Sequence, residues 1–289
     1  MLSPFRVLHP TTIEEASSEL ARLGDQAVIY AGGAELVLLI RNGLIQPDYL
    51  VNIKRIPGLD GISSNNGEVR IGTAVTHRRL ETDPVIHARL PALAEAESHV
   101  GNIRVRSQGT LGGNLCFADP HADPGTALLV YDASVEIGGA NGGRQLPLAE
   151  FLVGTYETAL QPGELLTEVR VPPLADGWRA AFLRIERFYR PTANVAAALS
   201  VREGKVDAVR LAVGCVGPKA MRLTELEGQL HGASLQEADR MLRDSKPYLT
   251  EKLEPVSDLL GSAGYKITIT SVLLARALEQ AAQGNGGAH

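Results

Sequence analysis

Two pairs of adjacent glycines occupy positions where the backbone could bind an anion. Gly32-Gly33 follows the apolar run QAVIY, and Gly112-Gly113 lies within TLGGNLCFADPHADP at 110–124. A strand that leads into two glycines and then a helix leaves backbone N–H groups unpaired, and the helix dipole adds partial positive charge. Such a segment can bind phosphate without a lysine. Taken singly, however, each pair is more typical of a turn, as Gly138-Gly139 and Gly142-Gly143 illustrate.

Polar side chains follow the second glycine pair, namely Asn114, Asp119 and Asp123. A carboxylate at such a place can accept hydrogen bonds from sugar hydroxyls, as acidic residues do in nucleotide sites. The alternative for Asp119, which precedes Pro120, is that it bonds its own backbone in a turn. His121 has no second histidine, cysteine or paired carboxylate at metal-binding spacing, which favours a surface loop residue.

The sequence indicates no catalytic acid, base, nucleophile or metal site. It contains no nucleophile elbow and no Walker-type Gly-Lys-Ser/Thr. His77, Asp83 and His87 could form a cluster, but Thr76-His77 is typical of a helix start. Phosphate-binding segments without catalytic side chains are typical of a protein whose cofactor brings its own reactivity.

Composition limits the class of protein. The 289 residues are 44% hydrophobic and 21% charged, as expected for two or three globular domains. A net charge of -5 with no basic stripe argues against a nucleic-acid partner. Cys116 and Cys215 are too few for a four-thiolate cluster or a disulfide framework. Without a signal peptide or an apolar run of about 20 residues, we expect a cytoplasmic protein with no membrane span.

The chain divides into three expected domains, with limits at 1–55, 56–175 and 176–289. The first is expected to form a parallel sheet with a crossover, and its predicted elements are a helix at 13–23 ended by Gly24, strands at 26–33 and 47–53, and a helix at 34–43 between them. The second is expected to be rich in β-structure. Its predicted elements are a hairpin turn at Asn66-Gly67, a helical stretch at 77–100 interrupted by Pro84 and Pro91, and strands in 127–139, 144 onward and 163–173.

The composition changes at Pro172-Pro173, which predicts the last boundary. Beyond it, 179–217 alternates as three strands with a turn at 203–205, which predicts an antiparallel meander. Helical periodicity follows over 223–282, and the Gly-rich tail 283–289 is expected to be disordered.

Several of these segments together resemble a known family. AGGAELVLLIRNG is similar to the first flavin loop, and IRVRSQGTLGGNLCFADPHADP to the second, of the FAD-binding (medium) subunits of molybdenum hydroxylases. The family includes carbon monoxide dehydrogenase flavoproteins and the FAD domain of xanthine dehydrogenases. GELLTEVRVP, GCVGPKAMRL and PVSDLLGSAGYKITITSVLLARALEQA extend the resemblance over nearly the whole chain.

The resemblance implies an α+β fold. Its parts are a two-subdomain FAD-binding domain of the vanillyl-alcohol-oxidase/PCMH type and a C-terminal domain of a three-stranded antiparallel sheet with helices. It implies FAD as cofactor, with two opposing loops around its diphosphate, Asp123 at its sugar portion, and Leu165 or Leu166, together with Val100, near its ring. The implied cofactor-binding residues are Ala31, Gly32, Gly33, Ala34, Glu35, Leu36, Val100, Thr110, Leu111, Gly112, Gly113, Asn114, Asp123, Leu165, Leu166 and Arg184.

The sequence departs from the family at the rim of this site. Ala34-Glu35 stands where the family has Ser, Asp or Thr-Asp, and Pro191-Thr192 replaces an acidic-aromatic pair. At a position where the family commonly has a lysine, this sequence has Arg184, although a shift of one residue would place Leu183 at that position. With only two cysteines, the branch that carries an extra iron–sulfur cluster in this subunit is disfavoured.

The implied function is an electron relay within an oxidoreductase. A molybdenum-containing large subunit and a small subunit with [2Fe-2S] clusters would be partners, and oxygen, NAD, a quinone or a carrier protein would accept the electrons. One alternative is a self-contained FAD-dependent reductase or oxidase of the same superfamily, although no flavin-linking His or Cys pattern supports it. Another is a binding module without cofactor, against which the intact glycines argue.

Overall fold

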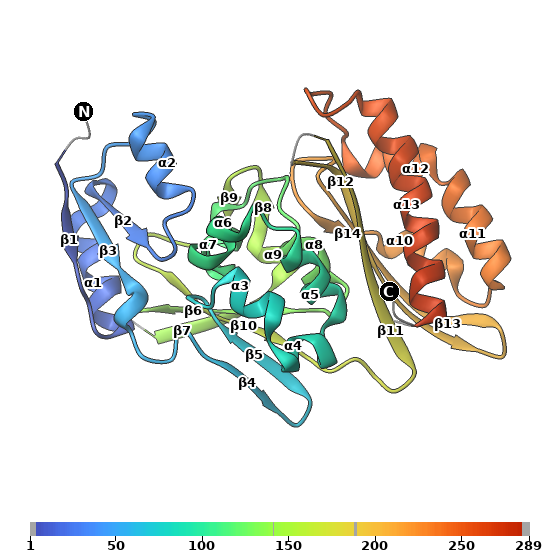
Figure 1. Cartoon of the computed structure of the whole chain (residues 1–289), viewed down its shortest axis with the longest axis horizontal. Helices are drawn as coiled ribbons and strands as arrows, with labels where there is room; N and C mark the ends of the chain where they lie inside the picture. The colour runs from blue at the N-terminus through green and yellow to red at the C-terminus, as the bar shows by residue number, and fades with distance from the viewer. Residues whose placement is uncertain (1–3, 141, 188–189, 285–289) are drawn as a thin grey trace.

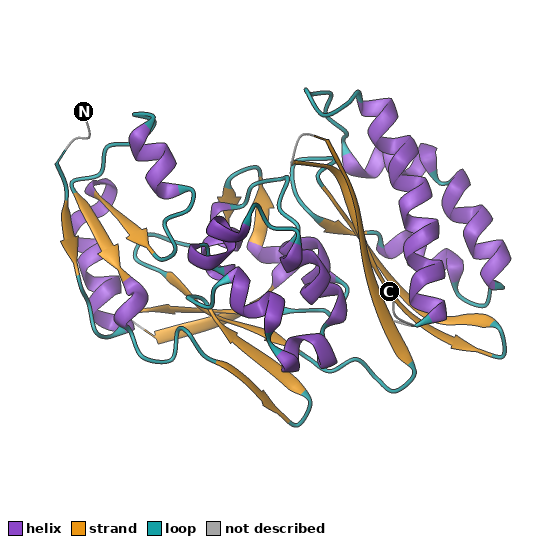
Figure 2. Ribbon diagram, in the orientation of Figure 1, coloured by secondary structure: helices purple, strands orange, loops and turns teal. Residues whose placement is uncertain are grey.

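The computed structural model describes residues 4–140, 142–187 and 190–284, which form three parts in a row (Figure 1). Helices and strands are mixed throughout, and each part has its own sheet (Figure 2). No helix within the described ranges is both long enough and apolar enough to cross a membrane. Of the tail that we expected to be disordered, Asn285–His289 lie outside the described residues, whereas Gln283 ends a helix.

The N-terminal part is a three-stranded parallel sheet, as predicted, with β1 as an additional strand. Its strands run in the order β1–β3–β2, and its elements are β1 (Arg6–Leu8), α1 (Ile13–Leu23), β2 (Ala27–Tyr30), α2 (Leu36–Arg41) and β3 (Tyr49–Asn52). Thr12 caps α1 by accepting from Glu15 N–H, and Gly24 follows its last residue. The end of β2 therefore leads directly into Gly32-Gly33 and then into α2.

The central part is an antiparallel sheet whose strands run in the order β4–β5–β10–β6–β7. Its strands are β4 (Ile62–Asn65), β5 (Glu68–Gly72), β6 (Ser134–Gly139), β7 (Gly142–Pro147) and β10 (Leu165–Val171), with the small pair β8 (Leu152–Gly154) and β9 (Glu157–Thr158) beside it. Asn66 and Gly67 have φ of +49° and +84°, as the predicted hairpin turn requires.

Short helices cover this sheet. They are α3 (His77–Thr82), α4 (Pro84–Arg89), α5 (Pro91–Ser98), α6 (Ile103–Gln108), α7 (Leu111–Phe117), α8 (Pro124–Leu129) and α9 (Leu148–Phe151). Pro84 and Pro91 each occupy the first position of a new helix, where a missing N–H costs nothing.

Two predictions for the central part were wrong. Gly112-Gly113 lies inside α7 rather than in a loop, and 127–129, which we expected to be strand, belongs to α8. In both cases burial explains the difference. Leu111, Leu115 and Leu128 are buried in one core, and this packing outweighs the weak helix propensity of glycine.

The C-terminal part is a sheet with both faces covered. The predicted meander is present as β11 (Trp178–Arg187), β12 (Arg190–Arg202) and β13 (Lys205–Gly214), and a fourth strand, β14 (Met221–Arg222), joins its edge. Along β12, Val195 and Ala197 pack toward α10 (Thr224–Leu230), α11 (Leu235–Asp244), α12 (Lys246–Leu253) and α13 (Ala263–Gln283), whereas Ala196 and Ala198 pack toward the central part. One core therefore joins the central and C-terminal parts.

Candidate functional site

A cleft of about 540 Å³ lies where the three parts meet. The N-terminal part contributes the end of β2 and α2, the central part contributes α7 and the segment after it, and the C-terminal part contributes Arg184 and Pro191. All predicted site residues line this cleft except Leu111 and Leu165. Residues separated by about 150 positions in the sequence thus share one cavity.

Leu111 and Leu165 are buried in the core instead. Leu111 begins α7 and is 0% exposed, and Leu165 is 1% exposed in the core of the N-terminal part. Successive residues of a strand face opposite sides of a sheet, so the neighbour of Leu165 on β10, Leu166, lines the cleft. Of Leu165 and Leu166, which the sequence left as alternatives, Leu166 is therefore the residue that lines the cleft.

The first glycine pair carries a run of open backbone donors. No residue that the structure describes accepts a hydrogen bond from the N–H groups of 32–36. Gly33 has a φ of +78°, a left-handed conformation that favours glycine, and it turns the chain between β2 and α2. Glu35, the departure from the family pattern, lines the same cleft.

In the second glycine pair, by contrast, the backbone donors are bonded. Leu111 N–H donates to Val75 O and Gly112 N–H donates to Thr73 O, both at 3.0 Å. Gly113 N–H donates to Thr110 Oγ1 at 3.1 Å, which makes Thr110 the helix cap. What remains open is a side chain, because Asn114 Oδ1 is buried without a hydrogen-bond partner among the described residues.

The two segments pack against the rest of the protein through their glycines. A Cβ on Gly32 would lie 2.3 Å from Gln108 O and 2.8 Å from Gly109 Cα. A Cβ on Gly112 would lie 1.6 Å from Thr73 Oγ1. Both positions therefore exclude any larger residue for reasons of packing within the protein.

Asp123 is the centre of a buried polar network. It is 4% exposed, and it accepts from Arg184 Nη1 at 2.6 Å and from Asn194 Nδ2 at 2.7 Å. Thr126 Oγ1 donates to Asn194 Oδ1 at 2.9 Å. Burial raises the pKa of Asp123, against the opposing effect of the Arg184 guanidinium. Arg184 Nε is buried without a partner among the described residues, so one donor of this arginine stays free beside the cleft.

The segment after α7 meets the C-terminal part through charged side chains. His121 Nδ1 lies 3.3 Å from Asp119 Oδ1, and its Nε2 lies 3.4 Å from Asp258 Oδ2. The buried Lys266 in turn holds Asp258 at 2.6 Å. His121 lies in a turn, as expected for a loop residue, and its partly exposed ring lies between two carboxylates.

No set of three or more metal-binding side chains occurs in the parts of the chain that the structure describes. Cys116 lines the cleft, and burial raises its thiol pKa to about 12, which disfavours the reactive thiolate.

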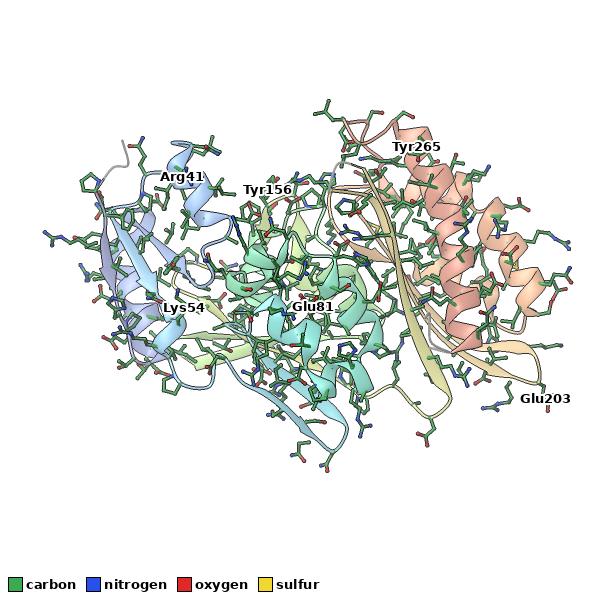
Figure 3. All side chains as sticks on the ribbon, in the orientation of Figure 1. Arg41, Lys54, Glu81, Tyr156, Glu203 and Tyr265 are labelled. Atoms are coloured by element: carbon green, nitrogen blue, oxygen red, sulfur yellow. The ribbon has the colours of Figure 1, made fainter. Side chains whose placement is uncertain are left out.

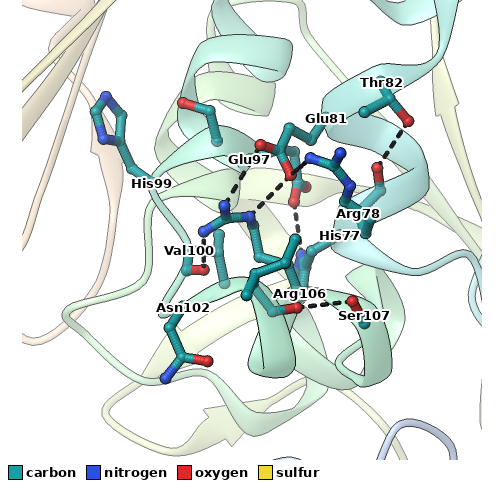
Figure 4. A network of polar contacts seen from close by, with 12 residues as sticks. His77, Arg78, Glu81, Thr82, Glu97, His99, Val100, Asn102, Arg106 and Ser107 are labelled. Carbon is teal, nitrogen blue, oxygen red and sulfur yellow. Dashed lines mark hydrogen bonds and ion pairs between the residues drawn. The ribbon is translucent and has the colours of Figure 1, made fainter.

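A buried pair that the sequence analysis missed also borders the cleft. His77 Nδ1 lies 2.6 Å from Glu97 Oε2 (Figure 4), and His77 also lines the cavity. Thr76 caps α3 as predicted. No local signal indicated the pair, because Glu97 is 20 residues away on another helix.

Comparisons with known families cover almost the whole chain. The model described as "FAD binding domain in molybdopterin dehydrogenase" matches residues 3–174. The model described as "CO dehydrogenase flavoprotein C-terminal domain" matches residues 190–281.

Individual relatives agree with these families. The chain is 33% identical to the carbon monoxide dehydrogenase medium chain of Hydrogenophaga pseudoflava, over 97% of this chain and 98% of the relative. It is 35% identical to a 6-hydroxypseudooxynicotine dehydrogenase complex subunit alpha from Paenarthrobacter nicotinovorans, over 93% and 92%. Among solved structures, a carbon monoxide dehydrogenase from Hydrogenophaga pseudoflava superposes with a TM-score of 0.93 at 32% identity, covering 98% of this chain and 99% of that chain. Quinoline 2-oxidoreductase from Pseudomonas putida 86 gives a TM-score of 0.90 at 30% identity, with 98% of both chains covered.

Proposed function

Because this chain belongs to the family of FAD-binding medium subunits of carbon monoxide dehydrogenase-type molybdenum hydroxylases, we propose that it relays electrons from an iron–sulfur partner subunit to an external acceptor. Its cofactor is FAD, and it is an oxidoreductase subunit. The single observation that carries the proposal is the cleft between the three parts, which presents the open backbone donors of 32–36.

The residues around the cleft fit FAD. The unpaired N–H groups of 32–36 offer several donors to a diphosphate, and the unpartnered Asn114 Oδ1 and Arg184 Nε offer further polar contacts. Leu36, Val100 and Leu166 give apolar surface suited to a flavin ring. When bound, FAD supplies the ability to accept electrons singly and release them in pairs.

We assign each group of residues one task. The segment 31–36 binds the diphosphate, and the segment 110–114 forms the opposing wall and contributes Asn114. Asp123 holds Arg184 and Asn194 in place, since both of its oxygens already accept bonds from these two residues. Arg184 orients its free Nε toward the cofactor. Asp123 retains lone pairs for a sugar hydroxyl, so the sequence-based role of this carboxylate remains part of the proposal.

Partner subunits need an exposed apolar surface on this chain. Several apolar side chains are exposed, among them Tyr156 at 57% and Tyr265 at 49%, both labelled in Figure 3. Leu44 is 69% exposed and Leu259 is 94% exposed. We propose that the molybdenum-containing large subunit and the [2Fe-2S] small subunit cover such residues, and that the acceptor is oxygen, NAD, a quinone or a carrier protein.

The three-part division at 1–55, 56–175 and 176–289 is likewise proposed. It is supported by a separate main sheet in each part, although the core shared by β11, β12 and the central helices links the second and third parts.

The test is isolation of the tagged chain from its native cell, followed by measurement of flavin, iron and molybdenum. We expect all three to co-purify, and we expect the flavin to be reduced only when the iron-containing partner is present. A yellow chain that purifies alone and is reduced directly by a soluble substrate would contradict the relay and support the self-contained flavoprotein.

A further inference from the structure

His77 and Glu97 form an ion pair that is almost completely removed from solvent. Their side chains are 3% and 0% exposed, and His77 Nδ1 lies 2.6 Å from Glu97 Oε2 (Figure 4). His77 begins α3, where its backbone N–H donates to Gly109 O at 3.0 Å. The backbone and one ring nitrogen are therefore fixed, which leaves Nε2 as the ring nitrogen without a hydrogen-bond partner among the described residues.

The His77 ring lies close to Gly109, the residue that joins the two glycine segments. A Cβ on Gly109 would lie 3.0 Å from His77 Cδ2 and 3.4 Å from His77 Nε2. Gly109 in turn is the residue against which Gly32 packs. His77, Gly32 and Gly109 all line the cleft, so the imidazole borders the same cavity as the open amides of 32–36.

The pair can carry one shared proton in two ways. Either Glu97 is ionised and His77 is an imidazolium, or Glu97 is protonated and donates to a neutral His77. Nε2 bears a hydrogen in both arrangements, since Nδ1 is engaged with the carboxyl group. Burial raises the pKa of Glu97, which favours retention of the shared proton. Loss of the proton would instead leave a negative pair with a lone pair at Nε2.

We propose that the buried His77–Glu97 pair, while it retains its shared proton, presents an N–H donor from His77 Nε2 to the FAD diphosphate, with Glu97 as the residue that positions it. This inference rests on the proposed placement of the diphosphate at 31–36. The pair supplies a charge-assisted donor in a site without lysine, and its own net charge stays zero while the proton is shared.

Other charged groups face the pair, but each is already compensated. Glu81 on α3 is paired with Arg78 at 2.9 Å and with Arg106 of α6 at 2.8 Å. Asp123, which also acts on Glu97, is paired with Arg184 of β11. Figure 4 shows the Glu81–Arg106 pair next to His77 and Glu97. The shared proton therefore neutralises the His77–Glu97 pair, as the arginines neutralise Glu81 and Asp123.

The experiment compares FAD with riboflavin, which has the flavin ring but no phosphate. Dissociation constants are measured by flavin fluorescence for the wild-type apoprotein and for the double variant His77→Phe/Glu97→Leu. Replacement of a buried ion pair by apolar residues of similar size preserves folding in many proteins. Thermal unfolding of each apoprotein provides the check on folding.

We expect the double variant to bind FAD about tenfold to a hundredfold more weakly, with riboflavin affinity unchanged within about twofold.

Glu97→Gln separates positioning from packing, because a side-chain amide at this position keeps the size of the carboxyl group but cannot share its proton. In the wild type the FAD dissociation constant should rise at the alkaline pH where the pair loses its shared proton, and in Glu97→Gln this rise should disappear. The matched control is Glu150→Gln in α9, an exposed glutamate that does not line the cleft. Its FAD affinity and pH profile should equal those of the wild type.

Two failures can be told apart. If the wild type binds riboflavin as tightly as FAD, the proposed diphosphate site at 31–36 is wrong. If the wild type prefers FAD and the folded double variant prefers it equally, the role of His77 is overturned while the proposed function stands. A double variant that does not fold shifts the decision to Glu97→Gln, where an unchanged pH profile overturns the proposal.

Discussion

The two glycine pairs look alike in sequence and differ in what they leave open. Gly32-Gly33 leads from a strand into α2, and the N–H groups around it have no acceptor among the described residues. Gly112-Gly113 forms the first turn of α7, and its N–H groups are bonded to Thr73 and Thr110. Adjacent glycines therefore indicate a need for small residues, but not whether the cofactor or the protein itself imposes that need.

The difference divides the site into a binding segment and a supporting segment. The first pair offers backbone donors to an anion, whereas the second fixes the wall opposite and presents Asn114. The following substitutions measure folding stability and FAD affinity separately. This division predicts that the two quantities respond differently to substitutions in the two segments.

Gly112→Ala is expected to have the largest effect, and it should act on stability. The new Cβ would overlap Thr73 Oγ1, with backbone atoms of Thr73 also close, so the helix must move or the site must open. We expect a loss of about 3 kcal/mol, at the upper end of the range for overpacking, and a fall in apoprotein Tm of about 6 °C or more. Thermal unfolding followed by circular dichroism measures it.

The matched control is Gly228→Ala in α10, where nothing lies within 4 Å of the new Cβ. Alanine there should stabilise the helix by about 0.5–1 kcal/mol. An unchanged Tm for Gly112→Ala, combined with loss of FAD binding, would mean that the second glycine pair contacts the cofactor directly. The proposed difference between the two glycine pairs would then be wrong.

Gly33→Ala should act mainly on FAD affinity. Its φ of +78° strains any other residue by about 1–2 kcal/mol, and its Cβ would lie 2.4 Å from the Tyr30 ring, so the open amides would shift. We expect the FAD dissociation constant to rise about tenfold, measured by equilibrium titration of the apoprotein. Gly43→Ala is the control, because Gly43 has a φ of +71° with no neighbour within 4 Å and does not line the cleft. Equal losses of FAD affinity in both variants would show that strain alone, and not the binding segment, is responsible.

Asn114→Ala tests the contribution of the supporting segment. Because Asn114 Oδ1 is buried without a partner among the described residues, its removal should leave the apoprotein Tm unchanged or slightly higher. FAD binding should weaken about fivefold to tenfold through the lost polar contact. Calorimetry of binding and unfolding on the same preparation gives both values. A lower Tm with unchanged FAD affinity would show that Asn114 contributes to stability and not to FAD binding.

Glu35→Gln should give the smallest effect, and it should be a gain. Glu35 places a negative charge among the donors of the binding segment, so its neutralisation should tighten FAD binding about twofold to fivefold. The gain should shrink as salt is added, because the charge lies near solvent. Glu14→Gln on the exposed face of α1 should leave the affinity unchanged. Weaker FAD binding by Glu35→Gln would place Glu35 in direct contact with a hydroxyl of the cofactor.

Much of the fold follows from the sequence, because its signals are local. Thr12 and Gly24 bound α1, Pro84 and Pro91 begin helices, and Asn66-Gly67 forms a hairpin turn. The strands of the C-terminal meander also lie where their alternation places them.

The site itself was less predictable, because its decisive features depend on tertiary contacts. The helical state of Gly112 depends on packing against Thr73, about 40 positions earlier in the chain. Asp123 meets Asn194 only after the central and C-terminal parts have folded together, and His77 meets Glu97 only after α3 has packed against α5. Periodicity reports which face of an element is buried, but it carries no information about which polar groups meet there.

Hydrogen–deuterium exchange of the apoprotein and the FAD-bound protein tests the division between the two segments most directly. In the apoprotein, the amides of 32–36 should exchange fast and those of 111–114 slowly, because only the latter have acceptors in the described chain. Addition of FAD should slow exchange at 32–36 strongly and change 111–114 little. Strong protection that appears at 111–114 and not at 32–36 would contradict the account and assign the diphosphate to the second glycine pair.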